Sequence, residues 1–213
     1  MPSSSSLTPQ ASSLFALIPA AGHSTRMGRP KLALPLGIRT VLERVIDALK
    51  SAGTDVLVVL GPHVAELAAP SRSAGAMVLE LPKATPHMRA TVEAGLAHLQ
   101  SQFHPDPEEP WLLAPADHPT LDADLVRIMA SAFNRLTAHS ICVPTFGDRR
   151  GHPTLIRWKH WPGIRAYPRD EGLNKYLRQF AGETLEMPAD SPDVLLDLDT
   201  PEDYERLKSR FPG

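Results

Sequence analysis

A loop of small and basic residues is the strongest chemical signal in this 213-residue chain. Residues 18–31 read IPAAGHSTRMGRPK, with one Lys, two Arg and no acid. The small side chains of Ala20, Ala21 and Gly22 let backbone N–H groups approach a ligand closely, and successive N–H groups form a nest for an anion. Because basic side chains follow directly, the loop predicts phosphate binding.

Two familiar phosphate motifs are absent from this loop. A dinucleotide fingerprint requires GxGxxG, whereas the loop has only Gly22 and Gly28. A Walker A loop requires GxxxxGK[ST], but five residues separate the two Gly, and Lys31 follows Gly28 by three positions. Arg26 and Lys31 remain as mobile positive charges for an anion. The alternative is an ordinary basic turn after a first strand.

Three aspartates stand where predicted strands end. Residues 111–117 (WLLAPAD) place Asp117 after a buried strand, and residues 195–200 (LLDLDT) place Asp197 and Asp199 near the end of another. Strand alternation predicts that the latter two share one face. Mg²⁺ is usually held by one or two carboxylates together with phosphate oxygens and waters. The aspartates are therefore candidate metal ligands.

Each aspartate also has a simpler interpretation. Asp117 is equally typical of the first turn of a helix, and Asp199 of a capping partner for Thr200. The phosphate loop makes the metal-binding interpretation more persuasive, because a phosphate and a divalent cation are commonly bound together.

Alternating strand and helix patterns must position these residues. Short apolar runs alternate with amphipathic stretches of helical length from residue 14 onward, which is typical of an α/β fold. The predicted strands are residues 14–19, 55–60, 76–79, 111–114, 140–144, 184–187 and 194–198. The predicted helices are residues 40–51, 62–69, 85–102, 122–136, 171–180 and 201–211, the last with Thr200 as N-cap. Turn-rich residues 145–161 predict a small hairpin excursion.

Composition limits the class of protein. Lys and Arg number 22 against 24 Asp and Glu, so the charge pattern of a general nucleic-acid or membrane-surface binder is missing. The single Cys142 excludes a disulfide framework and suits the cytoplasm. No apolar run approaches the roughly 18 residues of a bilayer span. Ser-rich residues 1–13 predict a disordered tail before a single domain, residues 14–213.

The basic loop, with its pattern AAG-x-S-x-R-M-G-x-x-K, resembles the signature loop of the MobA-like nucleotidyltransferases. Its PAAG start resembles the form found in molybdenum cofactor cytidylyltransferases rather than the LAGG form of the guanylyl enzymes. The resemblance implies a three-layer, Rossmann-like fold with a predominantly parallel sheet, of the nucleotide-diphospho-sugar transferase type. It assigns nucleotide binding to Pro19, Ala20, Ala21, Gly22, Ser24, Arg26 and Lys31.

Both acidic motifs match the same family. APADHPTL resembles its LGDxPxL metal motif and maps the metal aspartate onto Asp117. LLDLDTPEDYERL resembles its closing LLDIDTPEDL, which favours Asp199 as second metal ligand with Asp197 as substitute. Nucleotidyl transfer adds negative charge to the α-phosphoryl oxygens, so Mg²⁺ or Mn²⁺ and basic side chains would stabilise it. The implied catalytic residues are Arg26, Lys31 and Asp117.

Two further segments match this family. Residues 149–156 (RRGHPTLI) resemble its RGHPVLF-like segment, which lines the acceptor side; from the residues alone a solvated turn is the alternative. The residues implied there are Arg150, Gly151 and His152. Residues 86–96 (PHMRATVEAGL) take the place of its GMSSSLxxGL segment, which shapes the nucleotide pocket. Met88 is retained there, whereas Arg89 replaces a serine.

We therefore expect a Mg²⁺-dependent enzyme that transfers NMP from an NTP to a phosphorylated acceptor and releases pyrophosphate. The resemblance implies CTP, a molybdopterin acceptor and a molybdenum hydroxylase apoenzyme as recipient, without nucleic acid or membrane partners. One alternative is a sugar- or alditol-phosphate nucleotidyltransferase on the same scaffold. Another is a catalytically silent nucleotide-binding protein that delivers a cofactor. The intact basic and acidic residues favour an enzyme.

Overall fold

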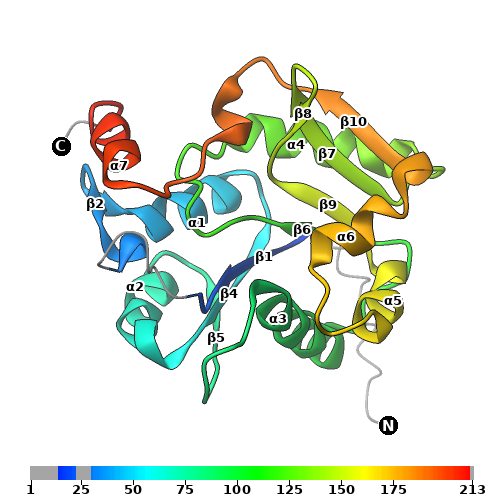
Figure 1. The fold of residues 1–213 in the computed structure, drawn as a ribbon, viewed down its shortest axis with the longest axis horizontal. Helices are drawn as coiled ribbons and strands as arrows, with labels where there is room; N and C mark the ends of the chain where they lie inside the picture. Colours follow the sequence, from blue (N-terminus) through cyan, green and yellow to red (C-terminus); the bar gives the residue numbers. More distant parts are fainter. Residues whose placement is uncertain (1–13, 23–29, 212–213) are drawn as a thin grey trace, which may run out of the picture.

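The computed structural model describes residues 14–22 and 30–211, and its centre is a mostly parallel sheet (Figure 1). The sheet has the order β10-β7-β9-β6-β1-β4-β5, with β8 paired to β7. Its strands are β1 Phe15–Ala20, β4 Asp55–Leu60, β5 Met77–Glu80, β6 Pro110–Leu113, β7 Ile141–Phe146, β8 Arg149–Arg150, β9 Thr154–Arg157 and β10 Thr184–Pro188. Only β8 and β9 run antiparallel to their neighbours among these strands. A separate ribbon pairs β2 Pro35–Leu36 with β3 Arg39–Thr40.

Helices cover both faces of the sheet. Side chains from α1, α2, α4 and α7 pack in one core, and those from α3, α5 and α6 pack in the other. The helices are α1 Val41–Ser51, α2 Ala68–Ser73, α3 Met88–Phe103, α4 Ala123–Arg135, α5 Trp161–Ala166, α6 Leu173–Arg178 and α7 Pro201–Lys208. The expected three-layer α/β fold is confirmed. No helix in the described part of the chain is long and apolar enough to cross a membrane.

Local sequence signals account for the elements beside β1. Thr40 caps α1, because its hydroxyl accepts the Glu43 N–H at 3.2 Å while the Glu43 carboxylate accepts the Thr40 N–H at 2.8 Å. The large apolar side chains of α1 are all buried: Val41, Leu42, Val45, Ile46 and Leu49. β4 occupies the predicted range, and its apolar side chains are buried on both faces of the sheet.

β1 is the point at which the strand order reverses. It lies between β4, the next strand of the large sheet along the chain, and β6, which comes after β5 and α3. In open α/β sheets, ligands bind beyond the carboxyl ends of the strands at such a switch point. A site is therefore expected beyond the carboxyl ends of β1 and β6.

A hairpin was predicted for residues 145–161. The structure has a hairpin only in the first part of this segment, and the rest returns to the sheet. β8 folds back on β7 through Thr145–Arg150 and Phe146–Arg149 pairs, with Gly147 at φ 57° in the turn. β9 then enters the large sheet between β6 and β7, antiparallel to both. The excursion thus contributes a strand to the centre of the sheet, next to β6.

The predicted strand at residues 194–198 is wrong. Pro192–Leu195 form a 3₁₀ helix instead, and proline at its start supplies no N–H for a strand ladder. The Leu198 N–H donates one hydrogen bond to the Asp117 carbonyl at 3.0 Å, which does not make a strand ladder. The alternation of Leu and Asp imitates a strand, and Asp197 and Asp199 do not lie on one face of a strand as predicted.

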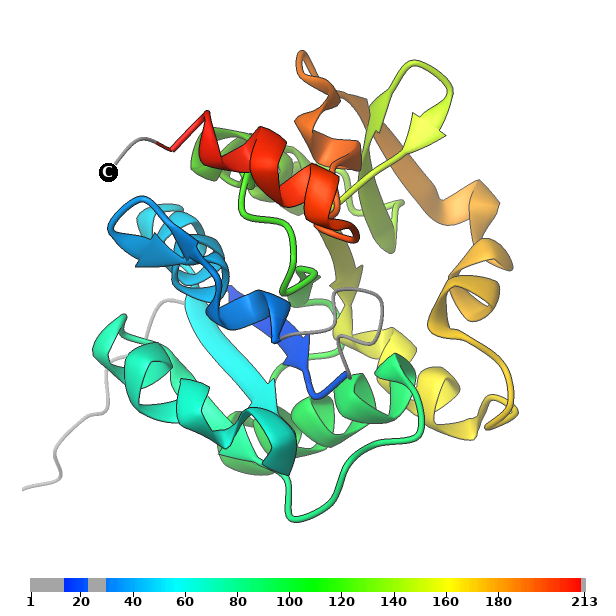
Figure 2. The same ribbon diagram turned by 60° about the vertical axis from the view of Figure 1, so that its left-hand side comes forward.

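The C-terminal helix α7 holds this segment beside the β2–β3 ribbon. The Tyr204 hydroxyl donates to the Pro35 carbonyl of β2 at 2.6 Å, and Figure 2 shows α7 (red) beside the β2–β3 ribbon (blue). Thr200 is the N-cap, as predicted, and its partner in the capping box is Asp203 rather than Asp199. The side chain of Asp199 is therefore not used in the helix cap.

Candidate functional site

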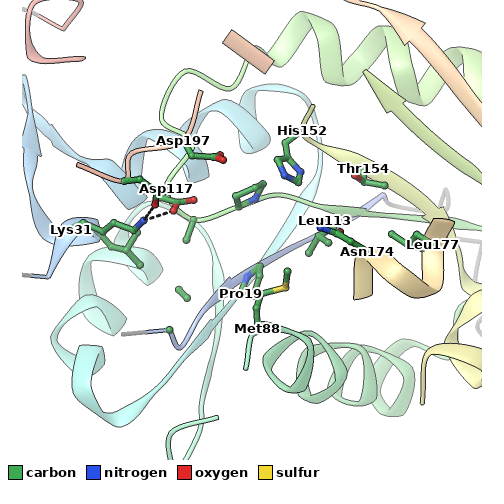
Figure 3. A pocket seen from close by; sticks show the side chains of 16 residues that line it. Pro19, Lys31, Met88, Leu113, Asp117, His152, Thr154, Asn174, Leu177 and Asp197 are labelled. Carbon is green, nitrogen blue, oxygen red and sulfur yellow. Dashed lines mark hydrogen bonds and ion pairs between the residues drawn. The ribbon is translucent and has the colours of Figure 1, made fainter. Parts of the chain in front are cut away.

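A cavity of about 370 Å³ opens at the switch point (Figure 3). The carboxyl ends of β1 and β6 form its floor, and the segment before α7, β9 and α6 surround it. Its lining residues include Pro19, Ala20, Gly22, Lys31, Met88, Ala116, Asp117, His152, Thr154, Asn174, Leu177, Asp197 and Asp199. Most of the residues predicted from sequence therefore line one cavity.

The described ends of the basic loop, residues 18–22 and 30–31, reach the cavity. Among its predicted residues, those that line the cavity are Pro19, Ala20, Gly22 and Lys31, whereas Ala21 is buried and does not line it. The Gly22 carbonyl lies 3.2 Å from Nε2 of His63, on the 3₁₀ helix Pro62–Leu67. Two further predicted residues, Ser24 and Arg26, lie outside the described residues.

Lys31 joins three segments that are distant in sequence. It begins the 3₁₀ helix Lys31–Ala33, and its Nζ donates to Asp117 Oδ2 at 2.5 Å, Asp199 Oδ1 at 3.0 Å and the Leu198 carbonyl at 2.8 Å. Burial lowers the pKa of this ammonium, but the two carboxylates outweigh burial and raise the pKa above its ordinary value. Lys31 is therefore a cation at neutral pH.

Asp197 faces two histidines beside this cluster. Its Oδ1 lies 3.5 Å from Nδ1 of the buried His118, and this contact lowers the pKa of Asp197 below its usual range. Burial lowers the pKa of His152, whose ring lies edge-on to that of His118. At neutral pH the carboxylate is charged and His152 is neutral. We call Lys31, Asp117, Asp197 and Asp199 the charged side of the cavity.

The chemistry of this donor set fits a hard divalent cation. Asp117 and Asp199 converge on one ammonium, so the folded chain already stabilises positive charge between them. Among residues 14–22 and 30–211, no group of three or more His, Cys, Asp or Glu is arranged to hold a metal ion by itself. Mg²⁺ characteristically takes one or two carboxylates and completes its shell with phosphate oxygens and waters. The cavity therefore suits a metal that arrives with a phosphate ligand.

The turn before β9 forms the far side of the site. The Gly151 N–H donates to the Pro144 carbonyl, and the His152 N–H donates to the Val194 carbonyl, both at 2.8 Å. A Cβ on Gly151 would lie 2.3 Å from that Val194 oxygen, so only glycine permits this approach. His152 lines the main cavity.

A second cavity of about 170 Å³ adjoins the first and shares four residues with it: His152, Thr154, Asn174 and Leu177. Arg150 and Gly151 line this second cavity only. The Arg150 guanidinium is bound to Glu186 of β10, through Nε at 2.7 Å and Nη2 at 2.6 Å. The structure thus separates Arg150 from the charged side.

Sequence reasoning did not single out Asn174 and Leu177, which project from α6 into both cavities. Figure 3 shows them across the cavity from Lys31. Their spacing of three residues puts them on one face of a helix, but nothing in the pattern says that this face meets a cavity. Thr154 of β9 lines both cavities as well, and we call Thr154, Asn174 and Leu177 the α6 side.

Met88 and Arg89 begin α3 and have opposite environments. Met88 lines the main cavity with about half of its surface exposed. Arg89 is 2% exposed and does not line the cavity, although it stands where the resembled segment has a serine of the nucleotide pocket. Its guanidinium binds backbone carbonyls behind the α6 side.

Comparison with known proteins places this chain in a family. Residues 16–185 match the MobA-like NTP transferase domain. The chain is 25% identical over 201 residues to the molybdenum cofactor cytidylyltransferase of Escherichia coli (strain K12), covering 94% of this chain and 98% of the relative. It is 26% identical over 216 residues to the molybdenum cofactor guanylyltransferase of Rhizobium meliloti (strain 1021), covering 92% and 91%.

Solved structures agree with this placement. The crystal structure of Rv0371c from Mycobacterium tuberculosis H37Rv matches with a TM-score of 0.75 and 26% identity, over 93% of this chain and 99% of that one. A structure of the same protein in complex with manganese matches with a TM-score of 0.71 and 25% identity, over 94% and 100%. The chain belongs to the MobA-like NTP transferase family and is a nucleotidyltransferase.

Proposed function

We propose that the chain transfers CMP from CTP to the phosphate of molybdopterin and releases pyrophosphate. The observation that carries this proposal is the convergence of Lys31, Asp117 and Asp199 in a cavity at the switch point of the sheet. The likeness to a molybdenum cofactor cytidylyltransferase over most of the chain supports the choice of CTP and molybdopterin.

In the proposed reaction, an oxygen of the acceptor phosphate attacks the α-phosphorus of CTP. The bond from that phosphorus to the bridging oxygen of the β-phosphate breaks, and pyrophosphate leaves with the electron pair. Negative charge grows on the α-phosphoryl oxygens, so positioned cations lower the barrier. Lys31 supplies one such charge, and Arg26 supplies a second.

Asp117 and Asp199 hold Mg²⁺ or Mn²⁺, with Asp197 as a substitute ligand. When bound, the metal polarises the phosphoryl oxygens and neutralises their charge. The manganese complex of Rv0371c supports a divalent metal in the proposed reaction. The Lys31 ammonium balances the two carboxylates until the nucleotide enters, and then shares its charge with the phosphates.

The acceptor lies along the α6 side and reaches toward the second cavity, where Gly151, His152 and Arg150 line its rim. Pro19, Ala20, Gly22 and Met88 hold the nucleotide on the opposite side. A molybdenum hydroxylase apoenzyme receives the product in the cytoplasm.

Pyrophosphate release from each of the four NTPs with Mg²⁺ or Mn²⁺, with and without molybdopterin, tests this function. We expect release that depends on CTP, metal and molybdopterin together. Release with a sugar or alditol phosphate but not with molybdopterin would mean that the acceptor is a sugar or alditol phosphate. Nucleotide binding without release on any acceptor would mean a silent cofactor-delivery protein.

A further inference from the structure

Arg89 is a buried cation with a complete set of partners. Its Nη1 donates to the carbonyls of Pro168 at 2.6 Å and Glu171 at 2.9 Å, and its Nη2 donates to those of Ile164 and Tyr167, both at 2.7 Å. Its Nε donates to Glu93 of the same helix at 2.8 Å. Because a guanidinium has five N–H donors, every one of them is used.

These bonds close the end of one helix and fix the start of the next. Ile164 belongs to α5 and Tyr167 is its C-cap, so their carbonyls are among those that a helix end leaves without internal partners. A cation there also interacts favourably with the helix dipole. Glu171 stands just before Gly172, the N-cap of α6. Arg89 thus ties the first turn of α3 to both ends of the α5–α6 connection.

The connection held by Arg89 leads directly to the wall of the site. Asn174 and Leu177 of α6 line both cavities, while Met88, the neighbour of Arg89, lines the main cavity from α3. The guanidinium therefore sets the position of the α6 side relative to the start of α3. All five of its N–H donors are bonded to Glu93 and to the four carbonyls, so none of them binds Lys31, Asp117 or Asp199 of the charged side.

We propose that Arg89 is a positioning residue for the acceptor: through α6 it sets the acceptor-binding wall without binding Lys31, Asp117 or Asp199 of the charged side. This inference rests on the proposed function for its kinetic consequence and on the hydrogen bonds alone for its structural one. Lysine keeps the charge at this position but has three donors on a different geometry, so Arg89→Lys cannot satisfy the same four carbonyls.

Steady-state kinetics with molybdopterin and CTP tests the proposal against two controls. Arg89→Lys is expected to raise the KM for the acceptor by about tenfold or more and to leave the KM for CTP unchanged, because a small misplacement of a wall weakens what it holds. Glu93→Gln keeps the four carbonyl bonds and is expected to change neither KM. Rates are divided by the folded fraction measured on the same sample.

Arg157 supplies the matched control for a purely structural arginine. It is 3% exposed and donates to the carbonyls of His139 at 2.9 Å, Phe133 at 3.0 Å and Glu108 at 2.5 Å, none of which lines either cavity. Arg157→Lys is expected to lower the melting temperature without changing either KM. If Arg89→Lys behaves like Arg157→Lys, or raises both KM values together, the positioning role is wrong.

Two further measurements keep the proposal open to refutation. If Arg89→Lys does not fold, Pro168→Gly loosens the held connection while keeping the buried cation, and it is expected to raise the same acceptor KM. Hydrogen exchange of residues 172–178 is expected to quicken in either variant, with no change near Lys31 and Asp117. This readout needs no turnover, so a wild-type protein without pyrophosphate release would refute the proposed function alone, whereas unchanged exchange at residues 172–178 would refute the role of Arg89.

Discussion

The charged side of the cavity is held in place by ion pairs between residues that line the cavity. The α6 side is held in place by hydrogen bonds to Arg89, which does not line the cavity. Lys31 binds Asp117 and Asp199 where the phosphates are proposed to lie, so the groups that hold this wall are also those proposed to do the chemistry. On the α6 side, Asn174 and Leu177 face the cavity, and Arg89 lies beneath their helix. The same fold thus separates chemistry from positioning, and substitutions on the two sides are expected to differ in kind.

The largest effect is expected from Asp117→Asn on the charged side. The change removes a proposed metal ligand and a partner of Lys31, and we expect pyrophosphate release to fall by about a thousandfold, near the upper range for one electrostatic group. Kinetics and circular dichroism on the same sample measure activity and fold. Glu205→Gln, on the exposed face of α7, is the acidic control and should be silent. Retained activity in Asp117→Asn would remove this residue from the catalytic set.

Lys31→Met tests whether the two carboxylates really form a cation site. We expect activity to fall by about a hundredfold through loss of the charge. We also expect Mg²⁺ or Mn²⁺ alone to raise the melting temperature of this variant more than that of the wild type, because the ammonium no longer competes for the carboxylates. Differential scanning fluorimetry over a metal titration measures this difference. Equal shifts in both proteins would argue against metal binding at Asp117 and Asp199.

A smaller effect, on stability, is expected at the turn beside the α6 side. Gly151→Ala would push a Cβ to 2.3 Å from the Val194 carbonyl oxygen, and we expect a loss of about 1–3 kcal/mol in the free energy of unfolding, as for an overpacked site. Gly182→Ala is the control, because nothing lies within 4 Å of its added Cβ. Urea denaturation of both variants measures the contrast, and equal losses would mean that the turn is not closely packed.

The smallest effect is expected at Cys142, in β7. Burial raises the pKa of its thiol to about 12. The thiolate is the reactive form, so iodoacetamide at pH 8 should label the native protein no faster than it unfolds. Mass spectrometry with and without urea measures this, and Asp117→Asn should leave the labelling rate unchanged. Rapid labelling of the folded wild type would show that the packing around β7 opens in the native protein.

Sequence patterns predicted the elements whose signals are local. α1 and β4 are recognisable because capping residues and apolar spacing lie within the element itself. The strand predicted at residues 194–198 is wrong because alternating Leu and Asp imitate a strand, while Pro192 directs the chain into a 3₁₀ helix. The place of β9 within the large sheet depends on pairing with β6 and β7, which the turn-rich sequence around it does not specify.

The site divides in the same way. Lys31, Asp117 and Asp199 belong to motifs that can be read along the chain, and the structure brings them together. Asn174 and Leu177 belong to no such motif, because their helix reaches the cavity through packing and through Arg89. Arg89 binds backbone carbonyls, which every residue has, so the residue types in the sequence do not identify these partners.

The most direct measurement is the balance between pyrophosphate and nucleotide product for the wild-type enzyme. CTP, Mg²⁺ and molybdopterin are incubated with the protein, pyrophosphate is quantified, and the acceptor is analysed by mass spectrometry. We predict one pyrophosphate for each molybdopterin that gains CMP, and no release when CTP, metal or acceptor is omitted. Pyrophosphate release without a modified acceptor, or no release with any NTP, would contradict the account.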